Sequence, residues 1–310
     1  MKAGVGRREL LLYALATACS RPEKPKQVNL AFAEPSASAP PLASSRACGA
    51  PELVQWSLEG VSTRAAILVP RETKATRFPV LVALHGHGEA VKGPERGALG
   101  WPNDYALNRA IERVCSPPLS TEDFEGLVTP EHLSEINRQL ATQPPSGLIV
   151  VCPYLPDLDL RRDSEIAGYG RFLAETLLPR VARELPAIAT AESTGIDGVS
   201  LGGAVALRAG LGLPATFGAV GALQPAIDDA KVADLVELAR AARSKRSGLR
   251  LRLTTSAEDY YRKVTHALSD AWRGAGLAHD FAELPGPHDY VFNRGPGAYE
   301  MLLWHERVLR

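Results

Sequence analysis

The sequence lacks an excess of charge of either sign. Its 310 residues contain 35 Lys and Arg against 35 Asp and Glu, so the formal net charge is zero. Domains that bind nucleic acid through a basic face usually carry a positive excess, so we do not expect a nucleic-acid partner. No apolar run is long enough to cross a bilayer, and no internal repeat is visible. An apolar content of 45% is ordinary for a globular protein with a buried core.

The chain is also poor in cysteine, with four such residues, at positions 19, 48, 115 and 152. No C-x-x-C pair is present, which argues against zinc or redox chemistry based on cysteine. If Cys19 is removed or lipidated, at most one disulfide can form within the chain. A Cys48–Cys115 bridge is one interpretation, and Cys152 is expected to be a small core residue in a buried strand.

Residues 1–18 are typical of an export signal. Lys2, Arg7 and Arg8 precede an apolar stretch that ends in the cleavage-like sequence Ala-Thr-Ala. The Arg-Arg pair resembles a twin-arginine signal, and Cys19 resembles the lipidated cysteine of bacterial lipoproteins, although the Leu which that motif prefers is missing. We therefore expect a protein that is exported, and either periplasmic or lipid-anchored at Cys19. A short N-terminal helix of a cytoplasmic protein is the alternative interpretation.

Residues 19–50 differ in composition from the rest of the chain. Pro, Ala, Ser, Lys and Glu dominate this segment, which cannot bury enough apolar surface to fold alone. The composition predicts a disordered tether followed by a folded domain at 51–310.

Strand-like apolar runs alternate with helical patterns along the folded domain. The runs are 54–58, 65–69, 78–84, 148–152, 217–223, 249–255 and 279–284. The helical patterns are 105–114, 130–139, 169–185, 201–211, 232–243, 261–275 and 300–309. This alternation predicts an α/β fold with a mostly parallel, doubly wound sheet flanked by helices. Residues 92–146 do not fit it, and we expect an insertion there that caps a pocket.

A G-x-S-x-G sequence centred on Ser200 lies between a short strand and a helix. A sharp turn at such a junction exposes the serine hydroxyl at the edge of a sheet, and Gly198 and Gly202 are needed because a Cβ there would clash with the neighbouring backbone. The helix N-terminus favours the negative charge that develops in acyl transfer. Ser200 is therefore the candidate nucleophile. The alternative is a glycine-rich loop with an incidental serine.

A serine nucleophile needs a base and an acid that orients the base. Among seven histidines, His288 lies in a loop after the last predicted strand, whereas His266, His279 and His305 lie within predicted helices or strands. Asp259 follows the preceding strand and is the favoured acid. Glu258, Asp228 and Asp229 are the other candidates for that role.

The oxyanion of the reaction needs two backbone N–H donors. Leu201, next after the serine, provides one, and His87 in the sequence His85-Gly86-His87-Gly88 provides the other. Each such donor contributes about 2.7–4 kcal/mol in comparable enzymes. A metal site at His85 and His87 is the competing interpretation, but further ligands are not evident nearby.

Residues 78–310 resemble the α/β-hydrolases and, more narrowly, the esterase D group of putative esterases. That group is close to S-formylglutathione hydrolases, enterochelin-type esterases and feruloyl or acetyl-xylan esterases. The matching motifs are 84–88, 169–185, 198–203, 256–259 and 286–290. The resemblance implies the α/β-hydrolase fold and a triad of Ser200, Asp259 and His288. Ser256 departs from the glycine that commonly opens the acid loop, and 92–146 matches nothing in that family.

The predicted function is a serine esterase that acts on a small-molecule or carbohydrate-linked ester without a cofactor. A peptidase of the prolyl-oligopeptidase type uses the same triad, but the chain has no room for its propeller domain. A non-catalytic binding protein with the same fold is the other alternative. Trp101, Tyr105 and Tyr154 would serve a carbohydrate-binding surface if they were exposed.

Overall fold

The computed structural model of the protein describes residues 48–71 and 75–309. The predicted export signal at 1–18 and most of the expected tether at 19–50 lie outside the described residues, so both interpretations stay predictions. Within the described residues, no helix combines the length and the apolarity needed to cross a membrane.

The described residues form a sheet of eight strands in the order β1-β2-β4-β3-β5-β6-β7-β8. The strands are β1 (Glu52–Ser57), β2 (Arg64–Val69), β3 (Val80–Leu84), β4 (Ile149–Pro153), β5 (Thr194–Gly198), β6 (Ala219–Leu223), β7 (Arg250–Glu258) and β8 (Asp280–Pro287). Strand β2 is antiparallel to both β1 and β4, and all other pairs are parallel. The carboxyl ends of β3, β5, β6, β7 and β8 therefore meet at the same edge, and the predicted mostly parallel sheet is confirmed.

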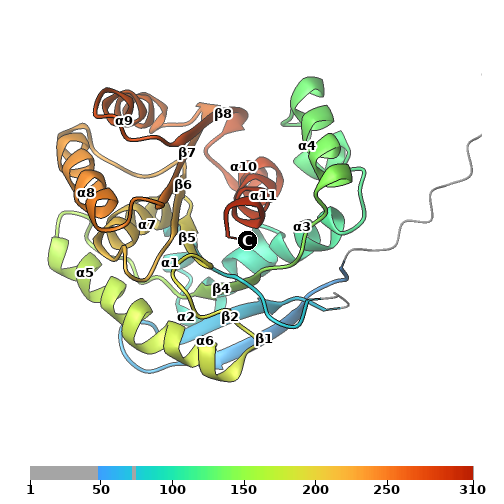
Figure 1. Cartoon of the computed structure of the whole chain (residues 1–310), viewed down its shortest axis with the longest axis horizontal. Coiled ribbons are helices and arrows are strands. Elements are labelled where there is room, and N and C mark those ends of the chain that lie inside the picture. Colours follow the sequence, from blue (N-terminus) through green and yellow to red (C-terminus); the bar gives the residue numbers. More distant parts are fainter. Residues whose placement is uncertain (1–47, 72–74, 310) are drawn as a thin grey trace, which may run out of the picture. The chain divides into compact units, whose positions relative to one another are not determined.

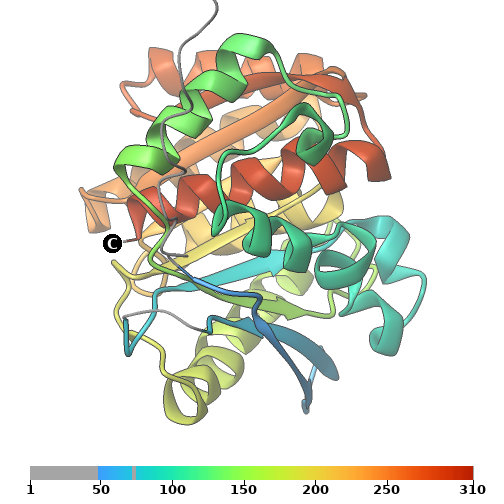
Figure 2. The same ribbon diagram turned by 90° about the vertical axis from the view of Figure 1, so that its right-hand side faces the viewer.

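The helices form two layers, one on each face of the sheet (Figures 1 and 2). They are α1 (His87–Ala90), α2 (Pro94–Gly97), α3 (Leu107–Val114), α4 (Pro130–Thr142), α5 (Asp163–Phe172), α6 (Leu178–Glu184), α7 (Leu201–Gly212), α8 (Val232–Lys245), α9 (Arg262–Gly274), α10 (Tyr290–Phe292) and α11 (Ala298–Val308). Helices α5 to α9 build one apolar core, and α3, α4 and α11 build the other. Every residue of β3 and β4 is buried, which explains their continuous apolar sequences.

One predicted helix differs from the structure in its extent. The helix expected at 169–185 begins at Asp163, and a π-helical turn at Leu173–Leu177 joins α5 to α6. The acidic residues Asp163 and Glu165 lie in its first turn, where carboxylates stabilise a helix N-terminus. The apolar periodicity alone did not reveal this polar first turn.

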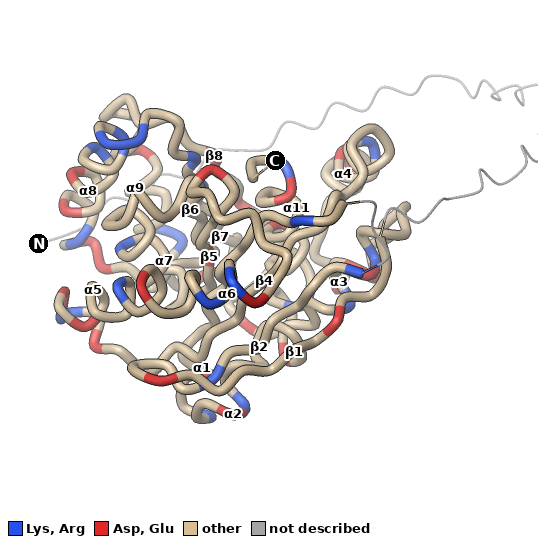
Figure 3. The backbone as a smooth tube through the Cα atoms, turned by 60° about the horizontal axis from the view of Figure 1, so that its bottom comes forward, with Lys and Arg blue, Asp and Glu red and all other residues tan. Residues whose placement is uncertain are grey.

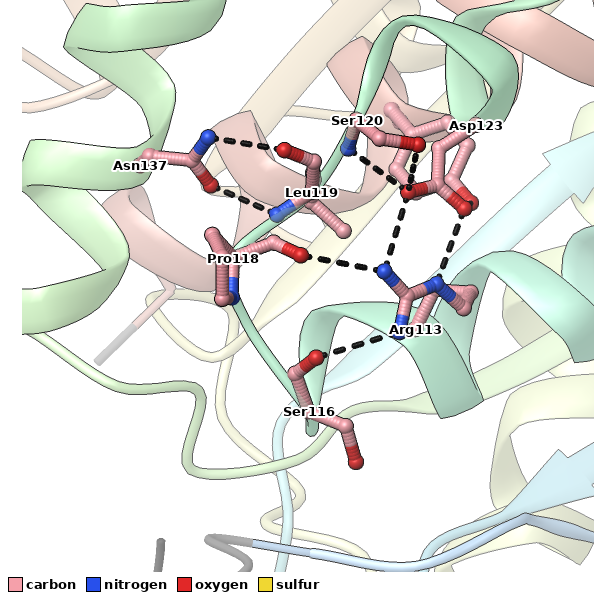
Figure 4. Close-up of polar contacts among 8 residues, drawn as sticks. Arg113, Ser116, Pro118, Leu119, Ser120, Asp123 and Asn137 are labelled. Carbon is pink, nitrogen blue, oxygen red and sulfur yellow. Dashed lines mark hydrogen bonds and ion pairs between the residues drawn. The ribbon is translucent and has the colours of Figure 1, made fainter. Parts of the chain in front are cut away.

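The segment 92–146 mainly covers a face of the sheet, beside α11. Its own polar contacts hold it together: the Arg113 guanidinium donates to both carboxylate oxygens of Asp123 at 2.9 and 3.0 Å, and Asn137 pairs with the backbone of Leu119 (Figure 4). Since Ile136 and Leu140 of α4 belong to the second apolar core, this segment is part of the domain's body. Most of the segment 92–146 therefore does not form the expected cap over a pocket.

A disulfide joins Cys48 to Cys115, with the two Cα atoms 5.2 Å apart. It connects the first described residues to the end of α3, across 67 residues of sequence. Cys152 is a free thiol buried in β4, and burial raises the pKa of this thiol. The sequence-based interpretation of these three cysteines is therefore confirmed.

Charged side chains of both signs are interspersed over the helices in Figure 3, in agreement with the balanced composition. A pair of opposite charges lies buried inside the domain. The Asp197 carboxylate of β5 accepts a bond from Arg252 at 2.7 Å and contacts His305 Nε2 at 3.0 Å. Burial alone would raise the pKa of Asp197, but the Arg252 charge and the His305 contact outweigh burial and lower it. Asp197 and Arg252 are 0% and 3% exposed, so each charge depends on the other.

We predict that Asp197→Asn lowers the free energy of unfolding by about 3–5 kcal/mol, because it leaves the Arg252 charge buried without a counter-ion. Chemical denaturation monitored by circular dichroism measures the change. The matched control is Glu237→Gln, which removes the partner of Arg240 in a pair whose side chains are 71% and 52% exposed, and should cost less than about 1 kcal/mol. Equal losses in the two variants would contradict the prediction.

Candidate active site

Ser200 occupies a strained turn between β5 and α7. Its backbone has φ 57° and ψ −118°, a conformation that residues other than glycine rarely adopt. A Cβ at Gly198 would lie 2.6 Å from the Gly202 carbonyl carbon, and one at Gly202 would lie 2.5 Å from the His85 carbonyl oxygen. The close approach of α7 to the strand ends therefore requires both glycines and leaves Ser200 at the tip of the turn.

Backbone hydrogen bonds fix this turn to the end of β6. The Ser200 N–H donates to the Leu223 carbonyl at 3.0 Å, and the Ala226 N–H donates to the Ser200 carbonyl at 3.0 Å. Next along the chain, the Gln224 side-chain amide donates to the Pro287 carbonyl at 3.0 Å. Because Leu223 and Gln224 are adjacent, Ser200 and the loop that carries His288 lie on the same rim of the sheet.

His288 and Asp259 meet on that rim, after β8 and β7. His288 Nδ1 lies 2.7 Å from Asp259 Oδ1, and the two side chains are 15% and 0% exposed. The Asp259 carboxylate also accepts from the Thr255 hydroxyl at 2.7 Å and from the Tyr261 N–H at 3.0 Å. These donors hold the carboxylate in place, and its contact with Nδ1 leaves Nε2 as the ring nitrogen available for proton transfer. Within the described residues, the Ser200 hydroxyl makes no hydrogen bond.

The other candidates for the base and the acid either contact other residues or are exposed to solvent. The histidines have these partners: His266 pairs with Glu283, His279 contacts Ser269 Oγ at 2.8 Å, and His305 contacts Asp197. Asp228 accepts a hydrogen bond from Ala230 N–H at the start of a short helix, and Asp229 and Glu258 are exposed. The structure therefore brings Asp259, and none of the three alternative carboxylates, onto His288.

The two expected oxyanion donors occupy equivalent positions. His87 is the first residue of α1, and Leu201 is the first residue of α7. An N–H at the first position of a helix has no partner within that helix, which is the position that the sequence-based hypothesis requires of both donors. A Cβ at Gly86 would lie 3.7 Å from Ser200 Cβ, so the loop that carries His87 borders the serine.

His85 is a structural residue. Its Nδ1 lies 2.9 Å from the Gly86 carbonyl, and its Nε2 accepts from the Leu155 N–H at 2.9 Å. Burial lowers the pKa of His85 to about 4. Both ring nitrogens are occupied, so the competing interpretation of His85 and His87 as metal ligands does not fit. Among the described residues, no group of three or more His, Cys, Asp or Glu side chains is placed to hold a metal ion.

A cavity of about 560 Å³ is lined by Ala204 and Ala226, whose N–H groups bond the Ser200 carbonyl, but neither Ser200 nor His288 is among its lining residues. Ala204, Ala226 and Ile227 form an apolar wall, and Tyr260 and Tyr261 lie on the side toward His288. The rings of these tyrosines are 5.4 and 5.6 Å from the His288 ring, and Tyr260 is 82% exposed. No residue of the segment 92–146 lines this cavity.

The exposed aromatic residues differ from those that the sequence singled out. Trp101 and Tyr105 are 0% and 2% exposed, so neither forms a carbohydrate-binding surface. Sequence reasoning did not select Tyr260 and Tyr290, which are exposed beside His288. Their positions, one residue after Asp259 and two residues after His288, were the available signal.

Comparisons with known proteins agree with this geometry. Residues 160–283 match the family model described as Esterase, putative esterase. The fold is that of the α/β-hydrolase esterases. The matched residues include Ser200 and Asp259 but end before His288. No curated protein matches the sequence.

Three solved structures with this fold illustrate the likeness. An S-formylglutathione hydrolase from Staphylococcus aureus is 14% identical, with 83% of this chain and 96% of that chain covered and a TM-score of 0.57. The feruloyl esterase module of Clostridium thermocellum, complexed with sinapinate, is 12% identical, with coverages of 84% and 89% and a TM-score of 0.59. The enterobactin esterase of Shigella flexneri is 19% identical, with coverages of 88% and 63% and a TM-score of 0.55. These structures share the fold that the resemblance implies, and the family model agrees with the predicted likeness to putative esterases.

We predict that His85 makes the stability of the protein depend on pH. The pKa of His85 is about 4 when folded against an ordinary 6.5, so its contribution is complete above pH 6.5 and is lost as the pH falls toward 4. Between pH 7 and pH 4 this loss amounts to about 3 kcal/mol. Denaturation curves of the wild type and His85→Gln should therefore converge as the pH falls. Curves that stay parallel across this range would contradict the prediction.

Proposed function

We propose that the protein is a serine carboxylic-ester hydrolase that acts through Ser200, His288 and Asp259. The observation that carries the proposal is the contact of His288 with the buried Asp259 on the same rim as the strained Ser200 turn. A serine hydroxyl becomes nucleophilic only when a base accepts its proton, and His288 Nε2 is the nitrogen left for that purpose. The match to putative esterases supports ester substrates over peptides.

In the first half of the reaction, Ser200 Oγ attacks the ester carbonyl carbon while its proton passes to His288 Nε2. Asp259 stabilises the resulting imidazolium through Nδ1. The N–H groups of His87 and Leu201 bind the oxyanion of the tetrahedral intermediate. When the carbon–oxygen bond to the alcohol breaks, His288 donates its proton to the leaving oxygen, and the acyl group remains on Ser200.

In the second half, His288 accepts a proton from water, and the hydroxide formed attacks the acyl carbon. The same N–H donors bind the second oxyanion. The bond to Ser200 Oγ then breaks, His288 returns the proton to Ser200, and the carboxylic acid leaves. Every proton in this cycle is carried by His288, so the proposal needs no cofactor.

The cavity beside Ser200 is the proposed binding site for one side of a small-molecule or carbohydrate-linked ester. Its apolar wall and its tyrosines suit an organic acyl or alcohol group, and 560 Å³ is within the range of small-molecule sites. Hydrolysis rates on a panel of esters that includes feruloyl esters and acetylated sugars would identify that group.

We also propose that the protein acts outside the cytoplasm, either in the periplasm or anchored by a lipid on Cys19. The Cys48–Cys115 disulfide supports this location, because disulfides persist in oxidising compartments and are rare in the cytosol. The basic and apolar pattern of residues 1–18 supports it independently.

We predict that Ser200→Ala and His288→Gln each lower kcat for p-nitrophenyl acetate by about 10⁶-fold, and that Asp259→Asn lowers it by about 10⁴-fold. Steady-state kinetics on the purified full chain measures the changes. The control is Ser244→Ala, an exposed serine on α8, which should retain the wild-type rate. Hydrolysis by Ser200→Ala at the wild-type rate, or activity confined to aminoacyl-anilides, would overturn the proposal.

A further inference from the structure

A buried carboxylate lies directly behind the proposed oxyanion loop, outside the proposed triad. Glu89 is two residues after His87, and its side chain is only 1% exposed. Buried carboxylates are rare unless hydrogen bonds and charges compensate for lost hydration. The partners of Glu89 therefore indicate why a charged residue occupies this position.

Three donors converge on the Glu89 carboxylate. The Tyr105 hydroxyl donates to Oε2, the Tyr290 hydroxyl donates to Oε1 at 2.6 Å, and Lys92 Nζ donates to Oε1 at 3.2 Å. Burial raises the pKa of Tyr290, and the bond to Glu89 raises it further, so the phenol keeps the proton that it donates. Each carboxylate oxygen of Glu89 therefore accepts at least one hydrogen bond from a residue outside α1.

These donors connect three segments that are far apart in the sequence. The Tyr105 hydroxyl, which donates to Glu89, also accepts from the Gly86 N–H at 3.3 Å. The Tyr290 hydroxyl packs against Gly88 of the same loop, since a Cβ there would lie 2.8 Å from it. His87 lies between these two contacted glycines. Tyr290 is in turn only two residues from His288.

We propose that Glu89 and Tyr290 are positioning residues, which hold the His87 N–H and the His288 loop in one fixed arrangement around Ser200. This inference rests on the proposed function. An oxyanion donor is effective only at about 2.7–3.1 Å from the developing charge, and a misplacement of about 1 Å costs about 10²-fold in rate. The Tyr290–Glu89 hydrogen bond joins the segment that carries the His87 N–H to the segment that carries His288, so it helps to set the distance between the oxyanion donor and the base.

The test compares Tyr290→Phe, which removes only the hydroxyl, with Tyr299→Phe. Tyr299 is the matched control because its hydroxyl also donates to a buried carboxylate, Asp123, at 3.4 Å, but away from the site. For Tyr290→Phe we expect kcat to fall about tenfold or more while KM changes less than about twofold, because the loss falls on the transition state. Tyr299→Phe should keep the wild-type kcat.

A second readout does not depend on the reaction. Hydrogen exchange followed by mass spectrometry should show faster exchange of the amides at 86–90 in both Tyr290→Phe and Glu89→Gln, and unchanged exchange there in Tyr299→Phe. The kinetic effects of Tyr290→Phe and Glu89→Gln should also be non-additive in the double variant, since Glu89→Gln puts an NH2 donor in place of one acceptor oxygen and so disturbs the hydrogen bonds that the Tyr290 hydroxyl joins.

The outcomes separate this inference from the proposed function. A wild type that hydrolyses esters through Ser200, combined with a Tyr290→Phe variant of unchanged kcat, would overturn the positioning role alone. Unchanged exchange at 86–90 in Tyr290→Phe would overturn it whether or not any ester is hydrolysed. A wild type without Ser200-dependent activity would overturn the proposed function and, with it, the catalytic purpose of the Tyr290–Glu89 bond.

Discussion

The close packing of the first turn of α7 against the ends of β3 and β5 is the contact on which the rest of the site depends. It is possible only because Gly198 and Gly202 lack side chains, and it forces Ser200 into a backbone conformation with positive φ. Such a conformation costs about 1–3 kcal/mol and persists only where the surrounding structure imposes it. Here the hydrogen bonds to Leu223 and Ala226 impose it.

The same packing creates the chemistry that we propose. A serine at the tip of this turn is followed by a helix whose first N–H groups have no partner, so the nucleophile and one oxyanion donor come from adjacent residues. The parallel strands then bring the remaining groups to the same edge, because each side chain follows the carboxyl end of a different strand. His87 follows β3, Asp259 follows β7 and His288 follows β8. The Gln224 side chain joins the end of β6 to the loop before His288.

The sequence was a good guide where a residue pattern has a single structural outcome. Continuous apolar runs can be satisfied only between two helical layers, so the strands were found within a few residues, and the G-x-S-x-G turn was identified from its glycines. Asp259 was favoured over Glu258, Asp228 and Asp229 from its position after a predicted strand, and the structure brings it to His288. Cys48 and Cys115 were one interpretation among few, because the chain has so few cysteines.

Other features depend on contacts between distant segments, which no local pattern encodes. The segment 92–146 has polar and charged residues that suggested a surface cap, yet Arg113 and Asp123 pair with each other within the segment and its apolar side chains join a core. Glu89 is an ordinary helix-forming residue in the sequence, and its burial follows only when Tyr105 and Tyr290 approach it from positions 16 and 201 residues away. Tyr260 was overlooked because its exposure beside His288 depends on the turn after β7.

The central claim is that the acyl group of the substrate is transferred to Ser200. The most direct measurement is rapid acid quenching during turnover of a slowly hydrolysed p-nitrophenyl ester, followed by mass spectrometry of the proteolytic peptides. We expect the peptide containing Ser200 to gain the mass of the acyl group in place of one hydrogen, and this adduct to disappear when the ester is exhausted. Turnover that leaves this peptide unmodified at every quench time, or an acyl group that accumulates on another residue, would contradict it.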